Sequence, residues 1–323
     1  MYTRLVGAML SALGLVFVVT GCGSHSPGDD RIGVRAMVIT MFDPEVEPWV
    51  KQRQWTQEIS VPGVRTPVRC NDAGLCVMVT DMGKVNASLS TTAVLASPRL
   101  NFDKAYFITA GIAGTPPEVG TLGFAAWARW VVDFDLGHHV LPQDDPSVPN
   151  NGYLSMPKAG TEAYELDQHL VDAVYRNTKG VALADSPAAA AARAAFPGQA
   201  DRKPDVQQCD TATGDNFWSG AASSAQAAAI VGMQTGGRAR YCTSQMEDNA
   251  TAGALARAGK LNRYVCLRTA SNFDRPRPGQ SVTDLLTAID TGAENPGFGL
   301  AVENAYRVAS AAADYLMAHP NLD

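Results

Sequence analysis

The sequence predicts an α/β fold, in which helices cover both faces of a mostly parallel sheet. Several continuous apolar runs have the length of strands, which is typical of strands buried on both faces. Segments with helical spacing separate these runs, as expected for strand–helix–strand units. Each run ends in glycine, polar or acidic residues. Because ligands of such sheets bind beyond the carboxyl ends of the strands, a site is expected there.

The first third of the chain contains three of the predicted strands. They are residues 35–42 (RAMVITMF), 76–80 (CVMVT) and 104–111 (KAYFITAG). The first run ends at Asp43 and Pro44, and the second leads into an Ala/Ser/Thr-rich helical pattern that follows Lys84. These runs predict neighbouring strands with a helix after the second.

The middle of the chain is less regular. Residues 161–178 have helical spacing. A second, Ala-rich helix is predicted to begin with Ser186 as its cap and Pro187 in its first turn, and to end at Gly198. We expect this second helix to be structural.

Two further strands are predicted in the last third, at residues 241–244 (YCTS) and 264–270 (YVCLRTA). A helical pattern starts between them, at Met246 and Glu247. Acidic residues near a helix start interact favourably with the helix macrodipole. That explanation is sufficient for a surface helix, but a ligand at the helix end is the alternative.

The N-terminus predicts a targeting segment. Arg4 precedes an apolar run over residues 5–20, and Val19-Thr20-Gly21-Cys22 follows. This pattern resembles the lipobox of bacterial lipoproteins, which implies cleavage before Cys22 and lipid attachment to it. An uncleaved membrane anchor is the alternative, but the apolar run is short for a span.

The predicted domain organisation follows from this segment. Residues 1–21 are expected to be a signal peptide, residues 22–32 a flexible tether and residues 33–323 a single domain. The protein is therefore expected outside the cytoplasm, lipid-anchored to the cell membrane or the outer membrane. No other stretch has 18 consecutive apolar residues, and the net charge of −6 gives no support for nucleic-acid binding.

The cysteines of an exported chain are expected to form disulfides. Cys70 and Cys76 flank the turn sequence Asn-Asp-Ala-Gly-Leu, which predicts a bridge across a tight turn. The pairing of the other three, Cys209, Cys242 and Cys266, stays open. A CxxC metal site is a poor alternative for Cys70 and Cys76, because their spacing is wrong and no matching pair follows, and no metal site is predicted.

Longer motifs resemble a known superfamily. The segments GDNFWSG, QMEDNAT and LRTASNFD, at residues 214–220, 245–251 and 267–274, look like those of nucleoside phosphorylases and nucleosidases, in the same order. A more specific similarity, over residues 34–318, is to the purine nucleoside permease family. The motifs that carry it are ITMFDPEVEPW, FDKAYFITAGIAG, GTLGFAAWARWVVD, QMEDNAT and LRTASNFDRP. This resemblance implies a three-layer α/β/α sandwich with a mostly parallel or mixed central sheet.

The resemblance also implies residues of a substrate site. Phe217 matches an aromatic residue that stacks on the purine, although a core phenylalanine is the alternative. Met246 and Glu247 match a pair that covers the ribose and hydrogen-bonds to it. Ala113 and Gly114 lie in a segment (ITAGIAGT) similar to a glycine-rich turn of the nucleosidases.

Four residues are candidates for catalytic roles by the same resemblance. Glu45 matches the glutamate that activates water, and a surface acid at a helix start is its alternative. Arg268 matches an arginine near the nucleophile. Asn272 stands where nucleosidases carry an aspartate that protonates the leaving purine, and an amide cannot replace that acid. Asp274 could supply the proton instead, or be a turn residue. Asn272 favours 6-oxopurines.

The anion ligands of the phosphorylases are not retained. Residues 42–46 and 109–111 lack the arginines that hold phosphate in the hexameric enzymes. Lys84, Arg268 and backbone N–H groups remain as candidate phosphate ligands. Ile112 replaces a small hydroxyl residue near the nucleophile. Phosphate is therefore a candidate co-substrate rather than an expected one, and no cofactor is predicted.

The resulting hypothesis is a purine nucleoside-binding protein that acts in nucleoside uptake or salvage and cleaves the N-glycosidic bond, by hydrolysis or phosphorolysis. The alternative is a non-catalytic extracytoplasmic receptor that delivers nucleosides to a separate membrane transporter. A storage-like protein that has lost the ligand is a weaker third option. The resemblance further implies a homo-oligomer.

Overall fold

The computed structural model describes residues 30–156, 158–291 and 295–322. The predicted signal peptide, the predicted lipidation site Cys22 and residues 22–29 of the predicted tether lie outside the described residues. Arg31–Asp323 is one compact unit.

A mixed sheet forms the centre of this unit. Its strands are β2 (Ala36–Thr40), β3 (Gln57–Ile59), β4 (Val68–Cys70), β5 (Leu75–Val79), β7 (Tyr106–Thr115), β8 (Ala125–Ala128), β9 (Trp130–Asp133), β12 (Ala163–Glu165), β13 (Val206–Gln208), β14 (Asp210–Thr213), β15 (Tyr241–Gln245) and β16 (Tyr264–Phe273). The strand order is β12-β9-β14-β15-β7-β2-β5-β4-β3, with β16 between β7 and β8, and β13 beside β8. The pairs β2–β5, β2–β7 and β7–β16 are parallel. Two smaller pairs are β1 (Ile32–Gly33) with β6 (Leu100–Asn101) and β10 (His138–His139) with β11 (Tyr153–Leu154).

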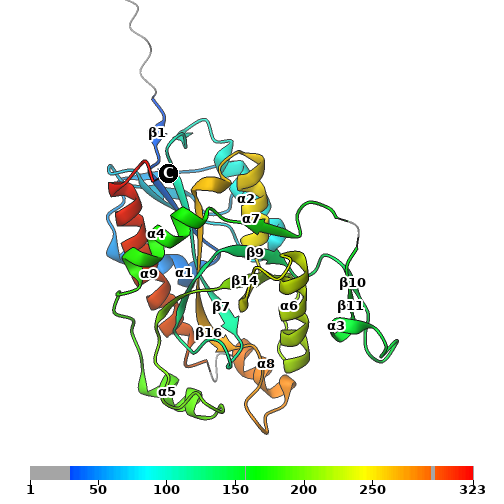
Figure 1. Ribbon diagram of the computed structural model, residues 1–323. Helices are drawn as coiled ribbons and strands as arrows, with labels where there is room; N and C mark the ends of the chain where they lie inside the picture. The colour runs from blue at the N-terminus through cyan, green and yellow to red at the C-terminus, as the bar shows by residue number, and fades with distance from the viewer. Residues whose placement is uncertain (1–29, 157, 292–294, 323) are drawn as a thin grey trace, which may run out of the picture. The chain divides into compact units, whose positions relative to one another are not determined.

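Helices cover both faces of the sheet, which confirms the predicted α/β architecture. They are α1 (Asp43–Gln52), α2 (Lys84–Leu95), α3 (Pro149–Gly152), α4 (Gln168–Thr178), α5 (Pro187–Ala194), α6 (Ala221–Gln234), α7 (Asp248–Arg257), α8 (Val282–Thr291) and α9 (Phe298–Ala318), with a 3-10 turn at Leu261–Arg263. Helices α1 and α4 pack with α9 on one face, and α2 packs with α7 on the other (Figure 1). The long α9 lies directly against β7 and β16.

The five predicted strands are present as β2, β5, β7, β15 and β16, but two are longer than expected. Strand β7 continues through the glycine-rich segment that was predicted to be a turn. Glycine suits position 111 because the Cβ atom of any other residue would lie only 2.1 Å from Met41 Cε and would clash with it. Strand β16 continues beyond Ala270 through a register shift that places Asn272 opposite Gly114 of β7. Both extensions run into the region where a ligand was expected.

Other elements differ from the sequence prediction. The N-terminal part of the predicted helix over 161–178 is strand β12, and α4 starts at Gln168 because the Asp167 carboxylate caps it through the Leu170 N–H. Helix α5 has the predicted Ser186 cap, but it ends at Ala194, before Gly198. Strands β8 and β9 were not predicted from the sequence, and their residues are all buried.

Two disulfides join cysteines in the part of the chain that the structure describes. One joins Cys70 to Cys76 across the turn between β4 and β5, and the other joins Cys209 to Cys242. The thiol of Cys266 is free and buried. Within the described residues, no helix combines the length and the apolar character that a membrane crossing requires.

Candidate active site

A cleft of about 270 Å³ lies where four strands of the sheet end. Its walls come from the residues after β2, the end of β7, the end of β15 with the residues that follow it, and the end of β16. They include Met41, Phe42, Glu45, Ile112, Ala113, Gly114, Ser244, Gln245, Met246, Glu247, Arg268, Ser271 and Asn272. Gly114 is the meeting point, because it pairs with Ser244 on one side and with Asn272 on the other. The position agrees with the sheet-end site predicted from the sequence.

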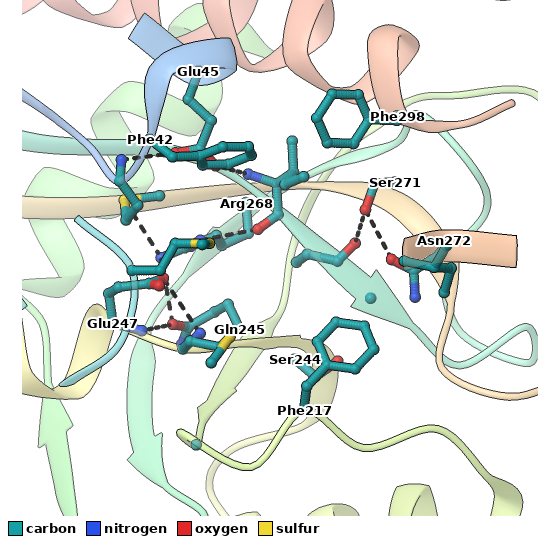
Figure 2. Close-up of a pocket in the computed structure, with 18 of the residues that line it drawn as sticks. Phe42, Glu45, Phe217, Ser244, Gln245, Glu247, Arg268, Ser271, Asn272 and Phe298 are labelled. Atoms are coloured by element: carbon teal, nitrogen blue, oxygen red, sulfur yellow. Dashed lines mark hydrogen bonds and ion pairs between the residues drawn. The ribbon is translucent and has the colours of Figure 1, made fainter. Parts of the chain in front are cut away.

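Arg268 is the buried cation at one end of the cleft (Figure 2). Its Nε and Nη2 atoms each donate to the Asp248 carboxylate at 2.8 Å. Nη2 also donates to Glu247 Oε2 at 3.0 Å, and Nη1 donates to the Ile112 carbonyl at 2.9 Å. A guanidinium with this many acceptors is fixed in orientation. Removing it would leave two buried carboxylates without their counter-charge, at a cost of about 3–5 kcal/mol.

Glu45 is a buried carboxylate at the same end, on the first turn of α1. Its Oε1 accepts from the Ile112 N–H at 2.8 Å, and its Oε2 accepts from the Met41 N–H at 2.8 Å. A Cβ atom on Gly111 would be 2.9 Å from Glu45 Oε1 and 2.8 Å from Arg268 Nη1, so both groups approach this glycine. Burial raises the pKa of the Glu45 carboxyl to about 8, although the Arg268 charge and the backbone N–H groups oppose the rise. Such a group gains and loses a proton near neutral pH.

Glu247 completes the charged end of the cleft. Its Oε1 accepts from the Gly83 N–H at 3.0 Å, so the turn before α2 holds it in place. Burial raises its pKa, against the opposing charge of Arg268. Gln245 supports it, because Gln245 Oε1 accepts from the N–H groups of Glu247 and Asp248 at 2.7 and 2.9 Å. The acidic pair in QMEDNAT thus has two tasks, since Glu247 lines the cleft and Asp248 binds Arg268.

The opposite end of the cleft is neutral and partly aromatic. Phe217 lines the cleft and is 49% exposed, so it is not a core residue. The Asn272 amide is tied to its own strand, since Oδ1 accepts from Ser271 Oγ at 2.8 Å and Nδ2 donates to the Phe273 carbonyl at 3.0 Å. Figure 2 shows Ser271 and Asn272 on the far side of the cleft from Glu45 and Glu247. An aromatic face beside an amide suits a planar heterocycle.

Two predicted site residues do not line the cleft. The Lys84 ammonium lies 2.7 Å from Asp135 Oδ2 and 3.2 Å from Asp133, so it is held by two carboxylates outside the cleft. Burial would lower its pKa, but these carboxylates raise it. The Asp274 side chain accepts from the Tyr241 hydroxyl at 3.1 Å and from Arg275 Nε at 3.0 Å. The Asp274 carboxylate is therefore engaged by Tyr241 and Arg275, and Asp274 does not line the cleft.

Several lining residues were missed. Phe42 and Phe298 form a ring pair with centroids 6.1 Å apart, on the other side of the cleft from Phe217 (Figure 2). Phe42 is three residues before Glu45 in the motif ITMFDPEVEPW. This proximity in the sequence could have indicated that Phe42 lies at the site. Phe298 and Ile289 come from α9 and α8, and no local pattern marks them. Among the residues that the structure describes, no cluster of histidine, cysteine or acidic side chains is arranged to hold a metal ion.

Comparison with solved structures defines the class of fold. The 5′-methylthioadenosine/S-adenosylhomocysteine nucleosidase from Colwellia psychrerythraea, in complex with adenine, is similar with a TM-score of 0.60 and 17% identity, over 88% of this chain and 96% of that chain. Futalosine hydrolase of Helicobacter pylori is similar with a TM-score of 0.56 and 14% identity, over 87% and 98%. The chain therefore has the nucleoside phosphorylase/nucleosidase fold.

Sequence comparison shows the family. The family model for purine nucleoside permease (NUP) matches residues 33–321. A probable purine nucleoside permease of Schizosaccharomyces pombe is 31% identical over 99% of this chain and 98% of the relative. The purine nucleoside permease of Candida albicans is 28% identical over 84% of this chain and 71% of the relative. The chain belongs to the purine nucleoside permease family.

Proposed function

We propose that this protein binds purine nucleosides in the cleft and hydrolyses their N-glycosidic bond, in a process of nucleoside uptake or salvage. Family membership supports a nucleoside-related function. The observation that carries the catalytic part is the arrangement of Glu45, Glu247 and Arg268 at one end of a cleft with an aromatic residue at the other. This arrangement provides separate places for a nucleophile, a sugar and a base.

The proposed roles follow from the chemistry of each group. The purine lies against Phe217, with one edge toward Asn272. The Glu247 carboxylate accepts hydrogen bonds from the ribose hydroxyls. Ionised Glu45 takes a proton from a water molecule, whose oxygen attacks the anomeric carbon. The electron pair of the broken C–N bond leaves with the purine, which takes up a proton from solvent. Glu45 then returns its proton to solvent.

Hydrolysis is preferred to phosphorolysis because of the charges in the cleft. Within the described residues, Arg268 is the only cationic side chain that lines it. Its guanidinium already has Asp248, Glu247 and the Ile112 carbonyl as partners. Lys84 is occupied by Asp133 and Asp135. A phosphate dianion would therefore meet two buried carboxylates and no available counter-charge.

A non-catalytic nucleoside receptor is the second candidate. Asn272 cannot donate a proton to the leaving purine, and Asp274 is turned toward Tyr241 and Arg275. Both observations favour a site that holds a nucleoside without cleaving it. A receptor of this kind would deliver its ligand to a separate membrane transporter.

Chromatography distinguishes these functions. The protein is incubated with inosine, guanosine and adenosine, each with and without phosphate, and free base is measured. We expect base release that does not depend on phosphate. Release only in the presence of phosphate would make the protein a phosphorylase. Intact nucleosides, together with calorimetric binding that disappears in Phe217→Ala, would make it a receptor.

We also propose that residues 1–21 direct export and that Cys22 carries lipid, which would anchor the domain to a membrane outside the cytoplasm. The sequence Val19-Thr20-Gly21-Cys22 supports this proposal. In a bacterial host we expect radioactive palmitate to label the full chain, and Cys22→Ser to abolish the label. A labelled Cys22→Ser protein, or an unlabelled full chain, would refute the lipid anchor.

A further inference from the structure

A second cavity, of about 570 Å³, adjoins the cleft beneath α8. Its walls come from α5, the residue Phe196 that follows α5, the end of β16, and α8. The proposed function does not use this cavity. Helix α5, which was expected to be only structural, contributes Ala191 and Ala192 to it, and Ala195 follows the end of that helix.

The second cavity adjoins the cleft at one particular end. Ser271, Asn272, Ile289 and Asn295 line both cavities. Glu45, Glu247 and Arg268, at the nucleophile and sugar end, line only the cleft. Figure 2 shows Ser271 and Asn272 away from these charged residues. The second cavity is therefore next to the place assigned to the purine, beyond the edge that faces Asn272.

The surface of the second cavity is mainly apolar. Phe196 and Phe273 pack with ring centroids 4.2 Å apart, and Leu122, Leu285 and Pro296 add aliphatic surface. Its polar lining residues are Ser271, Asn272, Arg275, Arg277, Gln280 and Asn295, and the Arg275 guanidinium is engaged within the protein. Arg275 donates to Asp274, Glu118 and Ser224.

We propose that the second cavity receives an alkyl or aryl group carried on the 6-amino nitrogen of the purine. The proposal rests on the nucleoside site proposed above, and it names the substrate class as N6-substituted adenine nucleosides with an apolar substituent. In the proposed binding mode the 6-position of the purine lies beside the Asn272 amide, whose Oδ1 already accepts from Ser271 Oγ and whose Nδ2 already donates to the Phe273 carbonyl. A substituent at that position leads from the cleft toward the apolar walls. Burial of such a group against them is favourable in proportion to its area.

Free bases test this proposal without any dependence on cleavage. Adenine, N6-methyladenine and N6-benzyladenine are titrated into the full chain by isothermal titration calorimetry. We expect the methyl group to be too short to fill the second cavity and the benzyl ring to reach it. We expect adenine and N6-methyladenine to bind similarly, and N6-benzyladenine to bind about tenfold more tightly or better. Equal or weaker binding of N6-benzyladenine would overturn the proposal, although adenine binding would still support the nucleoside site.

A pair of variants on α5 locates the benzyl group. Ala192→Trp fills the second cavity, so we expect it to remove the tenfold gain and to leave adenine binding unchanged. Ala194→Trp is the matched control, since Ala194 is exposed on the same helix and does not line the cavity. A gain that persists in Ala192→Trp would place the benzyl group elsewhere and overturn the proposal.

If adenine itself does not bind, the proposed nucleoside site fails and the inference fails with it. If Ala192→Trp does not fold, the wild-type ligand series still decides the question.

Discussion

At the scale of single residues, Glu45 shows how the fold sets the chemistry of a side chain. One guanidinium, that of Arg268, serves the two carboxylates of Glu247 and Asp248, and Glu45 lies nearby in the same buried region. Burial therefore dominates for Glu45 and raises its pKa from the usual 4.5 to about 8. The folded chain holds a proton that the unfolded chain releases, so ionisation of Glu45 lowers stability as pH rises from 4.5 toward 8.

The first prediction concerns the pH dependence of hydrolysis. Because the base must be ionised, kcat/KM for inosine is expected to rise about tenfold per pH unit at low pH and to level off above pH 8. Glu45→Gln is expected to lower kcat by roughly 10²–10⁴-fold. Glu47→Gln is the control, because Glu47 is exposed on the same helix and pairs with Lys51. A rate that is constant between pH 6 and pH 9 would contradict the role of Glu45.

Residue types and motifs predicted most of the residues that line the cleft, but they did not predict where every side chain points. Glu45, Glu247, Arg268 and Asn272 line one cleft, as the motifs implied. Asp274 follows Asn272 by two positions, but it lies beyond the register shift of β16 and binds Tyr241. Lys84 is the first residue of α2, but its ammonium group pairs with Asp133 and Asp135 and does not line the cleft. Such competition between distant partners has no local signal in the sequence.

At the scale of elements, the start of α7 links the sheet to the site. Strand β15 ends at Gln245, and α7 begins three residues later at Asp248. Gln245 closes the gap, because its Oε1 accepts the first N–H groups of this segment and its Nε2 donates to Thr211 Oγ1 and Thr213 Oγ1 at 3.1 and 2.7 Å. The acids at the helix start are therefore held by a buried amide as well as by the macrodipole.

The second prediction follows from this connection. Gln245→Ala removes five buried hydrogen bonds and leaves the N–H groups of Glu247 and Asp248 without this acceptor, so we expect a loss of about 2–4 kcal/mol in the free energy of unfolding. Nucleoside binding should also weaken, since Glu247 loses its orientation. Urea denaturation and calorimetry measure the two effects. Gln52→Ala, at the exposed end of α1, should change neither by more than about 0.5 kcal/mol. Unchanged stability in Gln245→Ala would show that the N–H groups find other acceptors.

Hydrophobic periodicity predicted the buried strands, but it failed where strand β12 is followed directly by helix α4. Strands β2, β5 and β16 have continuous apolar sequences that only a sheet covered on both faces can bury. Strand β12 was mistaken for part of a helix, because its three residues pair with β9 at one side and show no alternation of burial. Glycines in β7 suggested a turn, whereas Gly111 makes room for Met41 and Glu45, and Gly114 makes room for Ser244. A close approach by another segment cannot be seen in a single strand.

At the scale of the whole molecule, the two disulfides constrain the unfolded chain differently. Cys70 and Cys76 are 6 residues apart, and Cys209 and Cys242 are 33 apart. The sequence predicted the first bridge from its turn, but it left the second open, because that pairing depends on β15 lying beside β14. A longer closed loop removes more conformational entropy from the unfolded state. The bridge that the sequence left open is therefore expected to stabilise the fold more.

The third prediction tests this ranking. Cys209→Ala with Cys242→Ala is expected to lower the free energy of unfolding by about 4 kcal/mol, and Cys70→Ala with Cys76→Ala by about 2 kcal/mol, from the loop lengths alone. Urea denaturation without reductant measures both. All four cysteines are buried, so the alanine replacements are comparable in polarity. Added reductant should destabilise the wild-type chain and leave a variant without any of the four cysteines unchanged. The opposite ranking would mean that local packing, rather than loop entropy, determines how much each bridge contributes to stability. A wild-type chain whose stability does not change with reductant would argue against a need for an oxidising compartment.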